Sequence, residues 1–509
     1  MSVPRTITAR LTDTDQDADL EQLREFIDTC PLLDHHCHCL MELEPPVTVT
    51  SLNNALLGTL TEAQGKAREQ AVHSIAVKRS IRELASALSA DATSLEGVAA
   101  ARLRLGEEAA NQKLFGATRI SALLIDDGLR GGVAHNGDVN WGVGGGESGS
   151  FEPGAATETA EVVASAVAQE GGQQAVSKST RRPPEVEQQR EAKRPGEEQG
   201  GNRRGEQGGE GGGERGEEQK QEQGEGQRWR WRGVAWHESL VPVVRRVLRL
   251  ETSIAAYRCG LSIDPFVTPS EVEIGIQATL ASVIQTSPPS LRLCDPRVIS
   301  FCIATALAVA AKHQLPLQIH CGFGDRDLDL AAANPLCLRS LLEYNEGLVE
   351  VPVGEVPEGE AHAGARGKAR GLGCSHASYA APIVLLHSCY PFMREASYLA
   401  SVYTMVYVDC GLVFSKLSLS GMKAALLDLL DLAPLTKVMM STDAVGFAEP
   451  YYLSAMWGRR ILFLALASIV QGGDLTLSEA FQAACGILHN NALRLYRIDM
   501  LSVVPPAIL

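Results

Sequence analysis

Four short apolar runs in this chain each end in histidine or aspartate, and this recurrence restricts the folds that the chain can form. With the polar residues that close them, the runs cover residues 32–38, 315–320, 383–387 and 437–443. Segments with apolar residues at helical spacing lie between the runs. Strands that alternate with helices form parallel sheets, because each helix carries the chain back to the start of the next strand. We therefore expect an α/β fold in which these polar residues share one edge of a sheet.

The spread of the candidates along the chain, from His36 to Asp443, favours a closed barrel. A (β/α)8 (TIM) barrel builds its active site from the C-terminal ends of different strands. An open doubly wound sheet binds ligands only near its switch point. The predicted fold class is α/β, a distorted (β/α)8 TIM barrel. Helices are expected over residues 19–30, 71–105, 269–286, 295–313, 334–344, 391–402, 420–431, 450–470 and 477–495, and further strands over 120–125 and 406–409.

The composition indicates which partners and which cellular compartment to expect. The chain has 509 residues, 45% of them hydrophobic, and its net charge of -15 argues against nucleic-acid binding. Its longest apolar run, residues 299–311, is too short to span a bilayer, and residues 1–25 lack the apolar core of a signal peptide. The 12 cysteines follow no disulfide spacing and indicate reduced thiols. We expect a cytoplasmic protein with no nucleic-acid or membrane partner.

A compositional break after residue 129 interrupts the barrel pattern. Up to residue 228 the chain is rich in Gly, Glu, Gln and Arg, and such a segment buries too little apolar surface to offset its ordering entropy. An arginine–glycine RNA-binding segment is the alternative, but over residues 181–228 Glu outnumbers Lys plus Arg, which cancels most attraction to phosphate. The predicted domains are the first part of a barrel (1–129), a low-complexity disordered insertion (130–235) and the remainder of the barrel (236–509), with a polar loop at 347–380.

His36 and His38 are the first candidate metal ligands. Alternate residues of a strand face the same side, so these two imidazoles point together while His35 points away. Asp34 shares their side and can orient a ligand or its neighbour. Two imidazoles on one face can bind one metal ion if ligands from elsewhere join them. An isolated His-x-His pair is a weak signal and is more simply explained by two hydrogen-bonded side chains.

His320, His387 and Asp443 can complete such a site. Each alone is more simply explained as a buried, hydrogen-bonded side chain, but all three follow apolar strands. Neutral imidazoles hold a divalent ion, a carboxylate completes the site and takes a proton from water, and a further imidazole polarises a substrate carbonyl. The sequence has no convincing glycine-rich phosphate loop and no G-x-S-x-G elbow. The residue pattern thus indicates a metal-dependent hydrolase.

Four residues near the predicted strand ends are candidate substrate contacts: Asp325, Arg326, Arg258 and Arg394. Asp325 and Arg326 follow His320 closely enough to reach a substrate. Arg394 follows His387 and either pairs with a substrate carboxylate or lies on a solvated helix face.

The motifs around these residues resemble those of the amidohydrolase superfamily, in its amidohydrolase-related branch. The chain is most similar to the amidohydrolase domain that precedes a type I glutamine-synthetase-like domain in plant nodulin-like and fungal developmental proteins. The similar segments lie at residues 34–38, 73–80, 120–129, 255–258, 318–325, 386–392, 398–403, 438–443 and 491–496. They extend over nearly all of the chain outside the insertion.

This resemblance implies one divalent metal ion, usually Zn²⁺, in a (β/α)8 barrel. The implied ligands are His36 and His38 from the first strand, His320 from the fifth and Asp443 from the eighth. His387, from the sixth strand, would lie beside the metal as a catalytic residue. Relatives with two metals use a carboxylated lysine on the fourth strand, where this chain has Tyr257 and Arg258.

Two departures from that family qualify the expectation. One predicted strand ends near Leu250 and the next begins near Ser253, without the helical crossover of a dozen or more residues that parallel neighbours need. Either a crossover helix is missing near residue 252, as a gene-model error would cause, or the strands are assigned wrongly there. No glutamine-synthetase-like domain is expected after Leu509, so ligase activity is not expected.

The predicted function is hydrolysis of a C–N bond, amide or cyclic amide, in a small polar substrate. A metal-activated water is the expected nucleophile, Asp443 the general base, and His387 the group that stabilises the tetrahedral anion. The alternatives are a metal-dependent non-oxidative decarboxylase of a small carboxylic acid and a non-catalytic assembly or signalling barrel. Both a monomer and a homo-oligomer remain open.

Overall fold

The computed structural model describes residues 13–43, 45–90, 93–126, 229–231, 246–250, 252–285, 292–348 and 380–506. All of these belong to one of two compact units, and the other unit, residues 136–138 and 147–227, lies outside the described residues. So do nearly all of the predicted insertion and the greater part of the predicted loop at 347–380. The fold is mixed α/β, as expected, with parallel strands in two sheets.

The first parallel sheet has the order β1-β3-β5 and the second the order β10-β9-β8-β7-β6. Their bounds are β1 Leu32–His38, β3 Ile120–Asp126, β5 Arg246–Leu250, β6 Thr252–Ser253, β7 Leu317–Ile319, β8 Ile383–Leu385, β9 Val406–Asp409 and β10 Val438–Met439. Backbone hydrogen bonds also join the ends of β1 and β10, where His38 N donates to Ala444 O at 2.8 Å and Asp443 N donates to His36 O at 3.0 Å. The predicted strands at 32–38, 120–125 and 406–409 are confirmed.

The predicted missing crossover helix concerns the strands β5 and β6. Only residue 251 separates these two strands, but they are not hydrogen-bonded to each other. β5 pairs with β3, whereas β6 pairs with β7. A crossover is required only between parallel strands that lie side by side, so these pairings leave the helix that is missing near residue 252 as a prediction.

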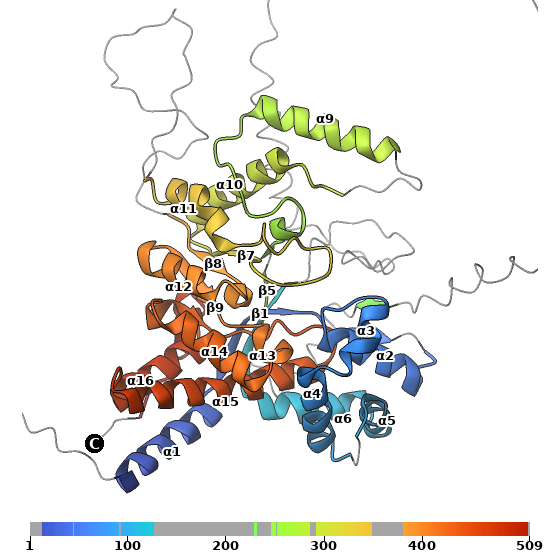
Figure 1. Cartoon of the computed structure of the whole chain (residues 1–509), viewed down its shortest axis with the longest axis vertical. Helices are drawn as coiled ribbons and strands as arrows, with labels where there is room; N and C mark the ends of the chain where they lie inside the picture. Colours follow the sequence, from blue (N-terminus) through green and yellow to red (C-terminus); the bar gives the residue numbers. More distant parts are fainter. Residues whose placement is uncertain are drawn as a thin grey trace, which may run out of the picture. The chain divides into compact units, whose positions relative to one another are not determined.

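The helices follow the predicted pattern with local differences (Figure 1). Their bounds are α1 Asp13–Thr29, α2 Val49–Leu60, α3 Lys66–Ala71, α4 Ile75–Ala87, α5 Leu95–Leu105, α6 Glu107–Thr118, α9 Pro269–Gln285, α10 Pro296–His313, α11 Arg339–Asn345, α12 Met393–Val402, α13 Val413–Lys416, α14 Leu419–Leu430, α15 Ala448–Gly472, α16 Leu477–Cys485 and α17 Asn491–Leu495. The predicted helix at 477–495 is divided, because a π-helical turn over Gly486–Asn490 separates α16 from α17. α2 and α6 were not predicted individually.

One small antiparallel sheet lies partly within the predicted insertion. β2 (Met41–Leu43) pairs with β4 (Trp229–Trp231). The predicted boundary assigned residues 229–231 to the low-complexity segment, but their Trp-Arg-Trp sequence suits a strand, since aromatic residues favour extended backbone.

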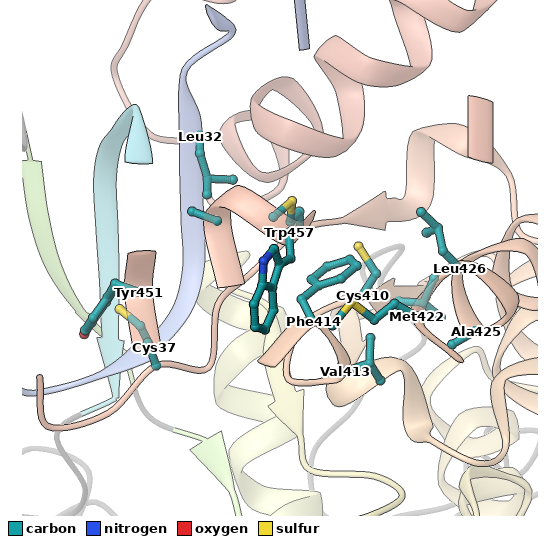
Figure 2. Close-up of a cluster of buried hydrophobic side chains, with 14 of the residues drawn as sticks. Leu32, Cys37, Cys410, Val413, Phe414, Met422, Ala425, Leu426, Tyr451 and Trp457 are labelled. Atoms are coloured by element: carbon teal, nitrogen blue, oxygen red, sulfur yellow. The ribbon is translucent and has the colours of Figure 1, made fainter. Parts of the chain in front are cut away.

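Helix α15 forms part of the apolar core around the sheets. It is long and apolar enough to cross a membrane, but 61% of its most apolar window is buried within the protein. Figure 2 shows its Trp457 beside Phe414 of α13, with Met422 of α14 nearby. The buried guanidinium of Arg459 donates to the carbonyl of Thr118 at 3.0 Å and to that of Ile27. α15 is therefore a core helix that joins α1, α6 and α14.

The loops after β7 and β8 are held together by a close backbone contact at Gly322. Gly322 has a φ of +73°, and a Cβ there would lie 2.4 Å from the carbonyl carbon of Cys389. Phe323 N also donates to Tyr390 O at 2.7 Å. Because these two loops follow His320 and His387 directly, the contact fixes the spacing of the two histidines.

Gly322→Ala is expected to destabilise the protein more than Gly473→Ala. Gly473, which ends α15, has a φ of +85°, and a Cβ added there would have no atom within 4 Å. Alanine at Gly473 costs only the left-handed backbone, about 1–2 kcal/mol. At Gly322 the steric contact adds about 1–3 kcal/mol. Urea unfolding midpoints measure both variants, and equal losses would contradict the role of the contact.

Candidate metal centre

The C-terminal ends of four parallel strands bring histidines and an aspartate together. His36 and His38 close β1, His320 follows β7 by one residue, His387 follows β8 by two, and Asp443 follows β10. His36 Nε2 and His38 Nε2 each lie 3.2 Å from the same oxygen, Asp443 Oδ1. His387 Nδ1 lies 3.6 Å from the other oxygen, Oδ2. Imidazoles from two strands thus surround the carboxylate that follows a third.

His36, His387 and Asp443 have the tightest geometry for a metal ion. Their ligand atoms all lie within 4.8 Å of one another. The ring of His320 packs against that of His387, with centroids 4.4 Å apart. The resemblance implied that His320 is a ligand and that His387 lies beside the metal. The structure brings both residues into the cluster, and it places His387, rather than His320, among the three residues closest to one another.

Two buried ring nitrogens of this cluster have no hydrogen-bond partner within the described part of the chain: His320 Nε2 and His387 Nδ1. An unsatisfied buried polar atom is costly, and about 1–3 kcal/mol is typical. A divalent cation bound by His320 Nε2 and the carboxylate would satisfy the first of these atoms, and His387 Nδ1 would remain available to a substrate. The donor set of imidazoles and one carboxylate also suits Zn²⁺. The residues therefore fit a metal ion.

The outer nitrogens of His36 and His38 are both engaged by oxygen atoms. His36 Nδ1 lies 2.9 Å from Gln318 Oε1, and His38 Nδ1 lies 3.1 Å from the carbonyl oxygen of Asp126. Each contact leaves the Nε2 atom directed at Asp443. Such partners orient metal-binding histidines and are typical of metal sites.

Asp34 holds the segment that carries Asp443. Its carboxylate accepts from Thr442 N at 2.9 Å and from Thr442 Oγ1 at 2.6 Å. Asp443 itself has a φ of +48°, a left-handed conformation that non-glycine residues rarely adopt. The expectation that Asp34 orients a neighbour of the site agrees with this contact.

Asp409, at the end of β9, is a supporting residue that the sequence analysis did not select. It accepts from His387 N at 2.9 Å and from Gly411 N at 2.9 Å, and it lies 3.2 Å from His35 Nε2. His35 therefore points away from the cluster, as predicted. The signal was present, because Val406–Asp409 is also an apolar run that ends in a carboxylate.

Gln318 is the second supporting residue that sequence analysis missed. Its amide nitrogen donates to His35 O at 2.9 Å and to Tyr496 Oη at 2.6 Å, while its oxygen faces His36. Gln318 lies inside β7 and is fully buried. A single polar residue within a short strand offers no local signal of such a role.

The electrostatics of the cluster centre on the ionised Asp443. Burial alone would raise the pKa of Asp443, but His387, His36 and His38 hold it well below its usual value. Burial lowers the pKa of His38, yet contact with Asp443 outweighs this and raises it to about 9. Burial lowers the pKa of His387. Burial and the neighbouring His387 lower the pKa of His320 well below its usual value. The latter two imidazoles are neutral near pH 7 and hence available as metal ligands or hydrogen-bond partners.

A second polar group lies beside His320. The ring of Tyr257 has its centroid 4.5 Å from that of His320, and its hydroxyl accepts from Asp325 N at 3.3 Å. Burial and the nearby Glu62 raise the pKa of Asp325 to about 6. Lys416 pairs with Glu62 at 2.6 Å. Of the predicted substrate contacts, Asp325 is thus linked to the cluster through Tyr257.

The three predicted arginine contacts lie in different settings. The side chain of Arg394 is 76% exposed and pairs with Asp428 of α14 at 2.9 Å. This is the solvated helix face that the sequence analysis left as the alternative. Arg326 is exposed in the loop after β7, and Arg258 is half-buried after Tyr257.

Comparisons with known proteins support the fold. No family model matches the chain. Protein fluG of Emericella nidulans is 31% identical over 252 residues, which are 48% of this chain and 25% of that protein. The chain thus spans about a quarter of the length of this curated relative.

Two solved structures share the fold. A proposed metal-dependent hydrolase from Lactobacillus casei has a TM-score of 0.56 and 21% identity, covering 93% of this chain and 97% of its own. Uronate isomerase from Thermotoga maritima has a TM-score of 0.50 and 11% identity, covering 96% of this chain and 98% of its own. These likenesses show an amidohydrolase-like α/β fold.

Gln318→Leu is expected to weaken metal binding about 10–100-fold, as loss of such an orienting partner typically does. The substitution removes the oxygen that faces His36 Nδ1. Competition with a chelator of known affinity measures the effect, and Gln277→Leu on the exposed face of α9 is the matched control. Unchanged affinity in the Gln318 variant would show that His36 does not depend on this contact.

Proposed function

We propose that the protein is a metal-dependent hydrolase that cleaves a C–N bond, amide or cyclic amide, in a small polar substrate. The observation that carries the proposal is the buried convergence of three histidines on Asp443, with His320 Nε2 unpartnered beside them among the described residues. The proposed ligands of a single divalent ion are His36, His38, His320 and Asp443. Zn²⁺ is the ion that best suits these donors.

When bound, a divalent ion at this centre would supply Lewis acidity and lower the pKa of a water. Asp443 is suited to receive the proton that the water loses. Its Oδ1 contacts both His36 and His38, whereas Oδ2 faces His387 at 3.6 Å and is the less engaged oxygen. His387 is proposed to steady the oxyanion that develops on the substrate carbonyl. Its backbone contact with Asp409 holds it for this role.

The wider assignments follow from the same fold. We propose that the two parallel sheets form one barrel, supported by the hydrogen bonds that join the end of β1 to the segment that follows β10. Residues 1–129 and 236–509 would make up the barrel around the insertion. A small molecule is the proposed partner, without nucleic acid or membrane, and the proposed compartment is the cytoplasm, supported by the free cysteines of the described residues. The oligomeric state, monomer or homo-oligomer, is to be measured in solution.

Elemental analysis and an activity screen test this function together. Untagged wild-type protein is expected to hold about one metal ion per chain, and His320→Ala or His36→Ala well below one. His313→Ala, at the exposed end of α10, is the matched control. Over a panel of small amides, ammonia or amine should be released. Carbon dioxide without ammonia would favour the decarboxylase, and a wild type that folds without metal would favour a non-catalytic barrel.

Asp325→Asn is expected to raise KM in a pH-dependent way. Because the pKa of Asp325 is raised to about 6, its carboxyl is largely neutral at pH 5 and ionised at pH 8. Asparagine resembles the neutral form, so the KM ratio of variant to wild type should be near one at pH 5 and increase above pH 6. Asp329→Asn, on the exposed part of the same loop, is the control. A ratio that does not change with pH would remove Asp325 from substrate binding.

A further inference from the structure

A cleft of about 710 Å³ lies at the N-terminal ends of the strands of the second sheet, opposite the metal centre. Gln314 of its lining precedes β7, Pro382 precedes β8, Met405 precedes β9, and Lys437 precedes β10. The cleft is therefore formed at the N-terminal ends of strands whose C-terminal ends carry the histidines and Asp443. At about 3.3 Å per residue, the five residues from Pro382 to His387 separate the two sites by roughly 15 Å.

The charge of this cleft is one-sided. Its lining includes Lys437, Arg494 and Arg497 and contains no aspartate or glutamate. This is notable in a chain that has 61 acidic and 46 basic residues. Outside the lining, the carboxylate of Glu346 accepts from Met405 N at 2.8 Å and raises the pKa of Lys437 against the larger, opposite effect of burial. The lining itself thus carries three cations, and a nearby carboxylate acts on one of them.

The cations are held in place by neutral oxygen atoms. Lys437 Nζ donates to the carbonyls of Ala400 and Tyr403 at 2.8 and 2.6 Å, which leaves one of its three N–H groups. Arg494 donates to Asn491 Oδ1 at 2.6 Å, and Arg497 donates to Gln314 Oε1. Each guanidinium uses one terminal nitrogen in these contacts and keeps further N–H groups. Fixed guanidinium groups with free N–H donors suit phosphate and carboxylate.

The remaining lining suits an apolar body attached to such an anion. Tyr407 of β9 presents its ring about 6.0 Å from Lys437 Nζ, and Met405 and Leu495 add apolar surface. We propose that this cleft binds a small phosphate- or carboxylate-bearing molecule with an apolar or aromatic body, at a site separate from the metal centre. The proposal does not depend on the hydrolase function.

Calorimetric titration of the full chain at low salt with phenyl phosphate and with benzoate tests this site, and phenol serves as the uncharged probe. At least one of the two anions should bind saturably with a Kd below about 1 mM, with phenol at least tenfold weaker. The Arg494→Gln, Arg497→Gln double variant should lose at least tenfold in affinity, because it removes two positive charges from the cleft. Both positions are exposed and keep a polar side chain. Arg339→Gln, which alters a solvent-exposed arginine paired with Glu343, should bind as the wild type does.

The metal centre is the competing location for an anion, so each titration is repeated on chelator-treated protein. Binding that persists after chelation and weakens in the double variant supports the cleft. Binding that disappears after chelation, or that is unchanged in the double variant, overturns the proposal, as does the absence of saturable binding of both anions. Circular dichroism of the double variant confirms that it folds. A protein that binds anions in the cleft but lacks metal would leave this inference standing while the hydrolase function fails.

Discussion

The carboxylate of Asp443 is the interaction on which the site depends. It receives imidazoles from the end of β1 on one oxygen and from the end of β8 on the other. An ionised carboxylate that is this deeply placed is costly unless it is paired, and here the neighbouring histidines provide the pairing. The surrounding hydrogen bonds position these partners: Asp34 holds Thr442, Asp409 holds the backbone of His387, and Gln318 holds the ring of His36.

The local parts of this arrangement could be predicted from the sequence, and the long-range parts could not. The strands at 32–38 and 406–409 have clear apolar patterns, and alternation along β1 correctly separated His36 and His38 from His35. Asp409 and Gln318 were missed for different reasons. Asp409 ends an apolar strand as Asp443 does, but this signal was not used. The role of Gln318 arises only from its contact with His36, 282 positions away in the sequence.

The pairing partners of β5 and β6 could not be predicted from the sequence. The sequence lacks a helix between Leu250 and Ser253, and a crossover is required if these two strands are neighbours in a closed barrel. In the structure, β5 pairs with β3 and β6 pairs with β7. Local patterns indicate where a strand begins and ends, whereas the identity of its neighbours depends on the rest of the fold. The same limit explains Arg394, whose partner Asp428 belongs to another helix.

The carbonyl oxygen of His35 determines which nitrogen of His36 carries the proton, because it can only accept and therefore orients the amide of Gln318. The amide nitrogen of Gln318 donates to Tyr496 Oη and to His35 O, so the amide oxygen must face His36 Nδ1. His36 Nδ1 then holds the hydrogen, and in the neutral ring the lone pair is left on Nε2, toward Asp443. His36 leaves the ribosome 282 residues before Gln318. A nascent chain therefore holds the first histidine of the centre long before the amide that selects its working tautomer.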